Sequence, residues 1–180
     1  MISVSENITL RPLSMGDVPF IFNIINMERE YLRQWLPFVD ITNEIEDTEH
    51  SVNEMMLSSN EQFSIYTGER LIGLVGFKDT DTGNRKTEIG YWLSQTAQGK
   101  GIMTNSVKSL LSYAFDELEM NRVQIRVAVD NHKSRKIPER LGFKLEGIER
   151  CGELLADDIF TDLAVYSLLA EEFKYIETCK

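Results

Sequence analysis

One segment constrains the fold of this chain more than any other, because it joins a strand, a glycine loop and a helix. Residues 88–93 form a β-rich run, and residues 98–104 read Gln-Gly-Lys-Gly-Ile-Met-Thr. Beyond them, apolar residues recur along one helical stripe: Val107, Leu110, Leu111, Ala114, Phe115 and Leu118. This segment predicts an anion-binding loop, since glycines let amides turn inward and a helix N-terminus carries partial positive charge.

Two common phosphate-binding loops do not fit these residues. A nucleotide-triphosphatase loop needs a Gly-Lys pair followed by Ser or Thr, whereas Gly101 follows Lys100 here. A dinucleotide fingerprint needs a third small residue near Thr104 and an acidic residue about 20 positions later. An ordinary strand-to-helix turn, in which the glycines only relieve backbone strain, remains an alternative on this segment alone.

The other patterns predict elements in an order typical of an α+β domain. Strand-like runs occupy residues 8–13, 63–66, 71–77, 122–129, 143–154 and 160–169. Helical patterns follow Asp17 and cover residues 44–59, and a short helix is expected before Leu141. No linker or repeat divides residues 1–180. We therefore expect a single domain with a mixed sheet of about seven strands and helices on both faces.

Composition excludes several classes of protein. The 180 residues include 29 acidic and 19 basic ones, a net charge of −10, which argues against a nucleic-acid-binding protein because phosphate binding rests on Lys and Arg. No apolar run approaches the roughly 20 residues of a membrane span, and the N-terminus lacks a signal-peptide pattern. Cys151 and Cys179 cannot form a disulfide framework, and His50 and His132 lack partners at metal-ligand spacing. We expect a cytoplasmic protein without a metal.

The glycine loop also carries a family pattern. Gln98 and Gly101 match Gln/Arg-x-x-Gly-x-Gly/Ala, with Met103 at the last position, and the motif resembles the acetyl-CoA loop of the GNAT N-acetyltransferases. Other segments resemble the RimJ/RimL branch of that family, in order along nearly the whole chain. They are Trp-Leu-Pro-Phe at 35–38, Glu-Ile-Gly-Tyr-Trp-Leu at 88–93, Asp-Asn-His-Lys-Ser at 130–134, Arg-Leu-Gly-Phe at 140–143, Leu-Glu-Gly at 145–147 and Val-Tyr-Ser-Leu at 165–168.

The resemblance implies acetyl-CoA as co-substrate, lying in a V between splayed central strands 88–93 and 122–129 of a strongly twisted sheet. In such enzymes the amine attacks the thioester directly. The cofactor-binding residues it implies are Trp92, Leu93, Gln98, Gly99, Lys100, Gly101, Ile102, Met103, Thr104, Asn131 and Ser134.

The same resemblance implies three catalytic candidates. Ser134 would donate to the leaving thiolate, although a hydroxyl near a helix start can instead serve the helix itself. Glu153 would accept the ammonium proton through water, and a solvated strand glutamate is the alternative. Glu88 competes for the role of base, as does water. Pro138 is expected to distort the helix near the Ser134 carbonyl and to leave only about one turn of helix before a kink.

The acceptor side is less constrained. Tyr31, Trp35 and Phe38 could line it, although an apolar cluster after a helix is more often core. The resemblance implies an N-terminal α-amine of a protein, for example a ribosomal protein, and homodimers are common in this branch. A small-molecule amine such as a polyamine or an antibiotic remains open, as does a CoA-binding module without catalysis.

The charges are expected to be unevenly distributed. Residues 40–61 hold seven acids and no Lys or Arg, which suits a cationic amine or a basic protein. CoA is polyanionic, so basic residues should surround its site. The candidates are Lys100, Lys108, Arg122, Lys133, Arg135 and Lys136.

Overall fold

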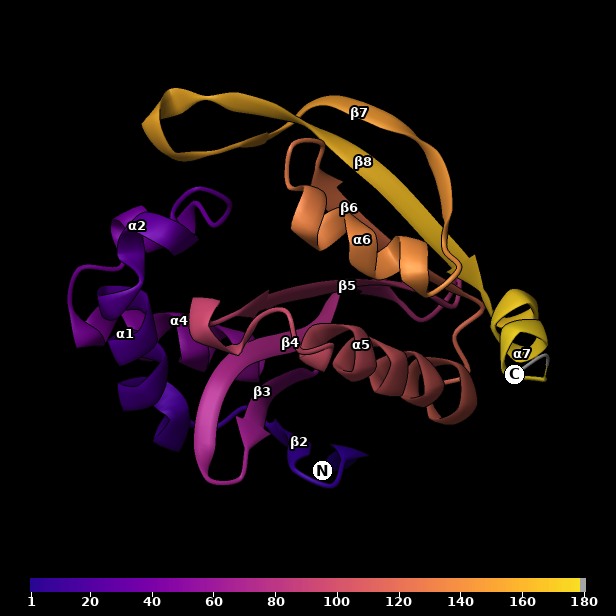
Figure 1. Cartoon of the computed structure of the whole chain (residues 1–180), viewed down its shortest axis with the longest axis horizontal. Coiled ribbons are helices and arrows are strands. Elements are labelled where there is room, and N and C mark those ends of the chain that lie inside the picture. Colours follow the sequence, from indigo (N-terminus) through magenta and orange to yellow (C-terminus); the bar gives the residue numbers. More distant parts are fainter. Residues whose placement is uncertain (179–180) are drawn as a thin grey trace.

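A computed structural model describes residues 1–178, so Cys179 lies outside the described part of the chain. Its core is one eight-stranded sheet with strand order β1-β2-β3-β4-β5-β6-β8-β7, in which β5 and β6 are parallel and all other pairs are antiparallel (Figure 1). The strands are β1 (Ile2–Ser5), β2 (Ile8–Pro12), β3 (Gln62–Thr67), β4 (Arg70–Asp81), β5 (Lys86–Leu93), β6 (Arg122–Ala128), β7 (Lys144–Leu154) and β8 (Phe160–Leu169). The expected mixed sheet is confirmed, with β1 added at one edge.

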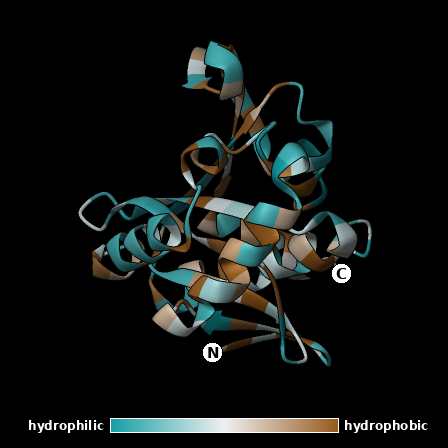
Figure 2. Cartoon of the chain, turned by 90° about the vertical axis from the view of Figure 1, so that its left-hand side faces the viewer, coloured by the Kyte–Doolittle hydropathy of each residue, from teal (hydrophilic) through white to brown (hydrophobic). Residues whose placement is uncertain are grey.

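Helices cover both faces of the sheet. They are α1 (Val18–Met27), α2 (Arg29–Leu32), α3 (Phe38–Ile41), α4 (Ile45–Leu57), α5 (Ile102–Ser112), α6 (His132–Arg140) and α7 (Ala170–Thr178). One buried cluster joins α5, α6 and α7 to the sheet, and a second joins α1, α3 and α4 to β3 and β4. The helices carry both hydrophobic and hydrophilic segments, as expected of elements packed on a sheet (Figure 2). Among the described residues, no helix is long and apolar enough to cross a membrane.

The first helices begin where the sequence predicts. Asp17 Oδ2 accepts the backbone N–H of Ser14 at 2.9 Å, and this buried carboxylate also accepts the Ser64 hydroxyl at 2.9 Å. Asp47 Oδ2 accepts the N–H of Glu44 at 2.9 Å at the start of α4. Both acids satisfy amides that have no partner within their helices, which fixes the start of each helix.

The two central strands pair over a short distance only. Their register joins Lys86–Glu88 of β5 to Arg122–Gln124 of β6, although β5 continues to Leu93 and β6 to Ala128. The predicted V between them therefore opens beyond Glu88. Backbone groups of β5 beyond this point can bind an extended ligand, because β6 does not pair with them.

Candidate active site

Two cavities lie on either side of the opened strands, and they meet. The first, about 660 Å³, is lined by the glycine loop, α2 and α6, and the second, about 530 Å³, by α1, α4 and the inner parts of β5 and β6. The six residues that line both are Trp35, Leu36, Tyr91, Trp92, Asn131 and Ser134. A reaction between a ligand in each cavity would take place at this junction.

The glycine loop adopts a conformation that requires glycine. Gly99 has a φ of +76°, and Gly101, the residue that precedes α5, has a φ of +73°. Side-chain-bearing residues rarely adopt such values, so both glycines are needed for the chain to turn into the helix N-terminus. Gln98 fixes the other end of the loop, since its Nε2 donates to the Leu93 carbonyl at 3.2 Å and its Oε1 accepts from Tyr31 Oη at 2.8 Å.

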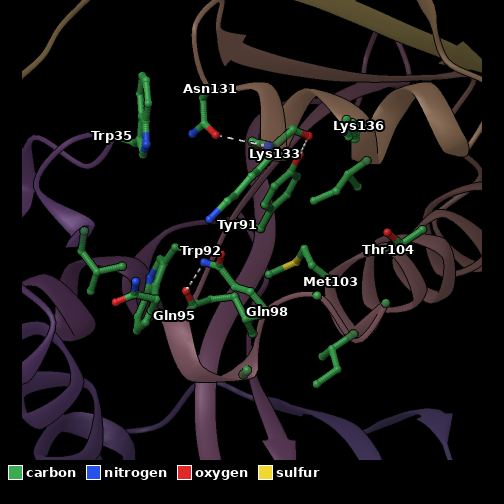
Figure 3. Close-up of a pocket in the computed structure, with 18 of the residues that line it drawn as sticks. Trp35, Tyr91, Trp92, Gln95, Gln98, Met103, Thr104, Asn131, Lys133 and Lys136 are labelled. Carbon is green, nitrogen blue, oxygen red and sulfur yellow. Dashed lines mark hydrogen bonds between the residues drawn. The ribbon is translucent and has the colours of Figure 1, made fainter.

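The predicted cofactor residues gather around the first cavity. Figure 3 shows Gln98, Met103 and Thr104 on one side of it and Asn131 and Lys133 on the other. Met103 also packs into the core and is 6% exposed. The predicted residues that line this cavity are Trp92, Leu93, Gln98, Gly99, Gly101, Ile102, Met103, Thr104, Asn131 and Ser134. Lys100, within the loop, is exposed and does not line the cavity.

The positive charge of this cavity comes from α6. Lys133, Lys136 and Arg140 line it, and they can bind phosphate groups. Two other basic residues that the sequence grouped with them are engaged elsewhere. Arg122 Nη1 donates to Glu146 at 2.6 Å, and Arg135 Nε donates to Tyr166 Oη at 3.0 Å. Arg140 was not among the basic residues predicted to surround the cofactor, although its position at the end of the predicted helix was the available signal.

Ser134 lies in the first turn of α6, and its hydroxyl points away from the helix. Asn131 Oδ1 accepts the Ser134 N–H at 3.2 Å and so caps the helix, whereas Ser134 Oγ donates to Tyr91 Oη at 3.2 Å. The hydroxyl therefore does not serve the helix itself. The helix is also longer than the single turn expected before Pro138, because α6 continues through Pro138 to Arg140.

Glu153 and Glu88 both line the second cavity, in different surroundings. Glu88 is 4% exposed, and its carboxylate accepts Arg126 Nε at 2.6 Å and pairs with Lys78 Nζ at 3.3 Å. Burial raises the pKa of Glu153, although the positive charges of Lys78 and Arg126 oppose this shift. The arrangement favours Glu153 over Glu88 as a proton acceptor, since Glu88 would have to leave two ion pairs.

The three residues predicted to line the acceptor side do not all line the same cavity. Phe38 lines the second cavity and Trp35 lines both, but Tyr31 lines the first cavity, where Lys133 Nζ lies 5.6 Å from the centre of its ring. Tyr31 is thus placed on the cofactor side rather than the acceptor side, because its hydroxyl is bound to the glycine loop through Gln98.

Comparison with known proteins identifies the family of this fold and site. Residues 7–144 match the family model described as an acetyltransferase (GNAT) domain. The chain belongs to the GNAT acetyltransferase family. The first cavity, with its glycine loop, opened strands and three basic residues, suits the acetyl-CoA that GNAT enzymes use.

Relatives of this GNAT chain align along nearly its whole length. YdaF of Bacillus subtilis (strain 168) is 37% identical over 177 residues, which cover 95% of this chain and 96% of YdaF. The ribosomal-protein-serine acetyltransferase of Escherichia coli (strain K12) is 30% identical over 94% of this chain and 97% of its own length. The structure of RimL, a ribosomal L7/L12 alpha-N-protein acetyltransferase in complex with coenzyme A, has a TM-score of 0.89 at 27% identity and covers 93% of this chain and 97% of RimL. The GNAT chain is accordingly an acetyl-CoA-dependent N-acetyltransferase.

Proposed function

We propose that this enzyme acetylates the N-terminal α-amine of a protein, and that the acceptor is a ribosomal protein. The observation that carries the proposal is the junction of the two cavities at Ser134, with Glu153 in the cavity opposite the glycine loop. The names of the E. coli relative and of RimL support the same acceptor class. We also propose that the enzyme is a homodimer and is cytoplasmic.

The proposed reaction needs one proton acceptor and one hydrogen-bond donor. Glu153 accepts a proton from the ammonium group through water, and the amine nitrogen attacks the thioester carbonyl carbon. The C–N bond forms, and the C–S bond breaks with its electron pair going to the sulfur of the CoA thiolate. The second proton of the attacking nitrogen passes through water to this thiolate, which leaves a neutral amide and CoA as the thiol. Ser134 donates a hydrogen bond to this sulfur. Lys133, Lys136, Arg140 and the backbone amides of the glycine loop hold the cofactor while the reaction proceeds.

An α-amine suits this site better than a lysine side chain does. The ordinary pKa of an α-amino group is about 7.7–8.0, and that of lysine about 10.4. A single carboxylate whose pKa is raised by burial is a sufficient base for the first, but leaves most lysine amines protonated. The acids of α4, among them Glu54 in the cavity wall, favour a positively charged chain beyond the amine.

Thiol release with matched acceptors tests this proposal. We expect turnover with peptides that copy the N-termini of ribosomal proteins, and none with the same peptides after chemical acetylation of their N-termini. Spermidine serves as the small-amine comparison. Faster turnover with spermidine than with every peptide would contradict the protein acceptor, and binding of acetyl-CoA without turnover of any amine would indicate a CoA-binding module.

A further inference from the structure

Tyr91 has no role in the reaction as proposed, yet it lies where the two cavities meet. Its hydroxyl contacts one residue twice. Tyr91 Oη accepts the Ser134 hydroxyl at 3.2 Å, and it donates to the Ser134 backbone carbonyl, also at 3.2 Å. The two residues are 43 positions apart in the chain, so the contact joins β5 to the first turn of α6 across the opened strands.

Pro138 explains why the Ser134 carbonyl can accept this hydrogen bond. In an α-helix the carbonyl of residue 134 accepts the N–H of residue 138, and proline has no N–H. Because α6 continues through Pro138, that carbonyl would otherwise lack its helical donor. The Tyr91 hydroxyl replaces it as the donor to this carbonyl.

The single hydrogen of Tyr91 therefore has two acceptors within reach. When the Ser134 hydroxyl donates to Tyr91, the Tyr91 hydrogen points to the Ser134 carbonyl. When the Ser134 hydroxyl turns toward a ligand instead, the Tyr91 hydrogen can turn to Ser134 Oγ. Desolvation raises the pKa of Tyr91, so its hydroxyl keeps this hydrogen across the ordinary pH range. A hydroxyl that accepts a hydrogen bond is a stronger donor, because neighbouring hydrogen bonds polarise one another.

We propose that Tyr91 is a positioning residue for Ser134, which it holds at the junction of the cavities and strengthens as a hydrogen-bond donor to the CoA sulfur. This inference rests on the role that the proposed function gives to Ser134. Only hydrogen bonds change at Tyr91, and no proton leaves it. Pro138 is part of the same arrangement, because it has no N–H to donate to the Ser134 carbonyl. That carbonyl therefore accepts the Tyr91 hydroxyl before the ligand binds.

A double-mutant cycle tests the coupling. Tyr91→Phe keeps the ring in place and removes only the hydroxyl. We expect it to lower kcat by about fivefold, the effect of one hydrogen bond, and to change the Kd of acetyl-CoA by less than about twofold. Ser134→Ala should lower kcat by about 100-fold. Adding Tyr91→Phe to Ser134→Ala should not lower kcat further. Tyr113→Phe is the matched control, since it removes a hydroxyl bonded to Glu61 at 3.0 Å and leaves both cavities unchanged.

The affinity for CoA gives a second readout that needs no acceptor. Calorimetric titrations with CoA are run well below and above the ordinary thiol pKa of about 8.5. The wild-type enzyme should bind CoA more tightly at the higher pH, where the sulfur is a thiolate. This gain in affinity should be smaller in Tyr91→Phe than in the wild type, and smaller still in Ser134→Ala. In the double variant the gain should equal that of Ser134→Ala.

The outcomes separate this inference from the proposed function. Equal losses of kcat on adding Tyr91→Phe to the wild type and to Ser134→Ala would overturn the positioning role, even with the Ser134 role intact. An unchanged kcat in Ser134→Ala would remove the Ser134 role and this inference with it. If no peptide is acetylated, the proposed acceptor is wrong, and the CoA titration alone decides the role of Tyr91.

Discussion

Two carboxylates in one cavity differ because their neighbours differ. Glu88 accepts from Arg126 and pairs with Lys78, and Gln124 Nε2 adds a contact at 3.3 Å. Burial raises the pKa of Glu153 instead. A carboxylate that is less stable in its charged form is a better proton acceptor near neutral pH, provided that it is still ionised there.

Glu153→Gln should therefore move the pH dependence of the reaction. Without the carboxylate, turnover depends on amine that has lost its proton in solution, with a pKa of about 7.7–8.0. We expect kcat/KM to fall by about 10- to 100-fold near neutral pH, and its profile to shift to higher pH. In the wild type, activity should be lost as the pH falls through the raised pKa of Glu153, because the protonated carboxyl cannot accept a proton.

Glu88→Gln is the matched control for this measurement. It leaves Arg126 and Lys78 without their buried partner, and we expect it to destabilise the fold by about 3 kcal/mol. The pH profile should move only slightly and to lower pH, because the Glu88 charge makes the smallest contribution to the raised pKa of Glu153. A profile shifted to higher pH in Glu88→Gln, together with an unshifted one in Glu153→Gln, would exchange the two roles.

At this scale, sequence spacing predicted residues close together in the chain better than contacts between distant ones. Gln98, Gly101 and Ser134 stand in short motifs, and the structure places all three at the first cavity. The contact of Tyr91 with Ser134 joins separate strands and helices, and no local pattern specifies it. One signal was present, since Pro138 four positions after Ser134 leaves a carbonyl that needs another donor.

Among the elements, the segment around α2 links both cavities. Tyr31 of α2 donates to Gln98 in the glycine loop, and Arg33 follows at the end of the helix. Arg33 Nε donates to Asp40 Oδ1 at 2.8 Å, and its Nη2 reaches Asp157 Oδ1 at 3.0 Å at the tip of the β7–β8 hairpin. The hairpin extends over α6 toward α2 (Figure 1), so these contacts hold the segment against the edge of the site.

Arg33→Met should loosen this segment. Because Asp157 is 68% exposed and the pair is partly screened by water and salt, we expect a modest effect. The KM for a peptide acceptor should rise by about two- to threefold, with kcat little changed. Arg11→Met removes the exposed pair with Glu69 and serves as control. Equal effects of the two substitutions on KM would show that the α2 contacts do not affect the acceptor.

Elements with strong internal patterns were predictable, and those that depend on distant packing were not. The apolar stripe located α5, although the structure ends its regular part at Ser112 and continues with a π-helical turn at Tyr113–Glu117. The edge strand β1 alternates apolar and polar residues, but its four residues are too short a run to predict a strand. The short C-terminal helix α7 is held by Phe173, which packs against Phe115 of the π-helical turn. Its sequence alone is too short to specify a helix.

Across the whole molecule, the charged residues beside the two cavities differ. Lys133, Lys136 and Arg140 line the cofactor cavity, and the acids of α4 lie beside the acceptor cavity. A net charge of −10 would repel a polyanionic ligand if it were evenly spread. The distribution instead favours CoA on one side and a cationic acceptor on the other. The contrast between an acidic segment and a basic cofactor site could be predicted from the sequence. Which basic residues line the cofactor cavity could be seen only in the structure.

The proposed function depends on transfer of the acetyl group to an α-amine at the junction of the two cavities. It is tested most directly by tandem mass spectrometry of a peptide that has a free N-terminus and an internal lysine, after incubation with the enzyme and acetyl-CoA. We predict acetylation at the N-terminal nitrogen, strongly reduced in Ser134→Ala. Acetylation at the lysine would rule out the α-amine as acceptor, and N-terminal acetylation at an unchanged rate in Ser134→Ala would rule out the role of Ser134.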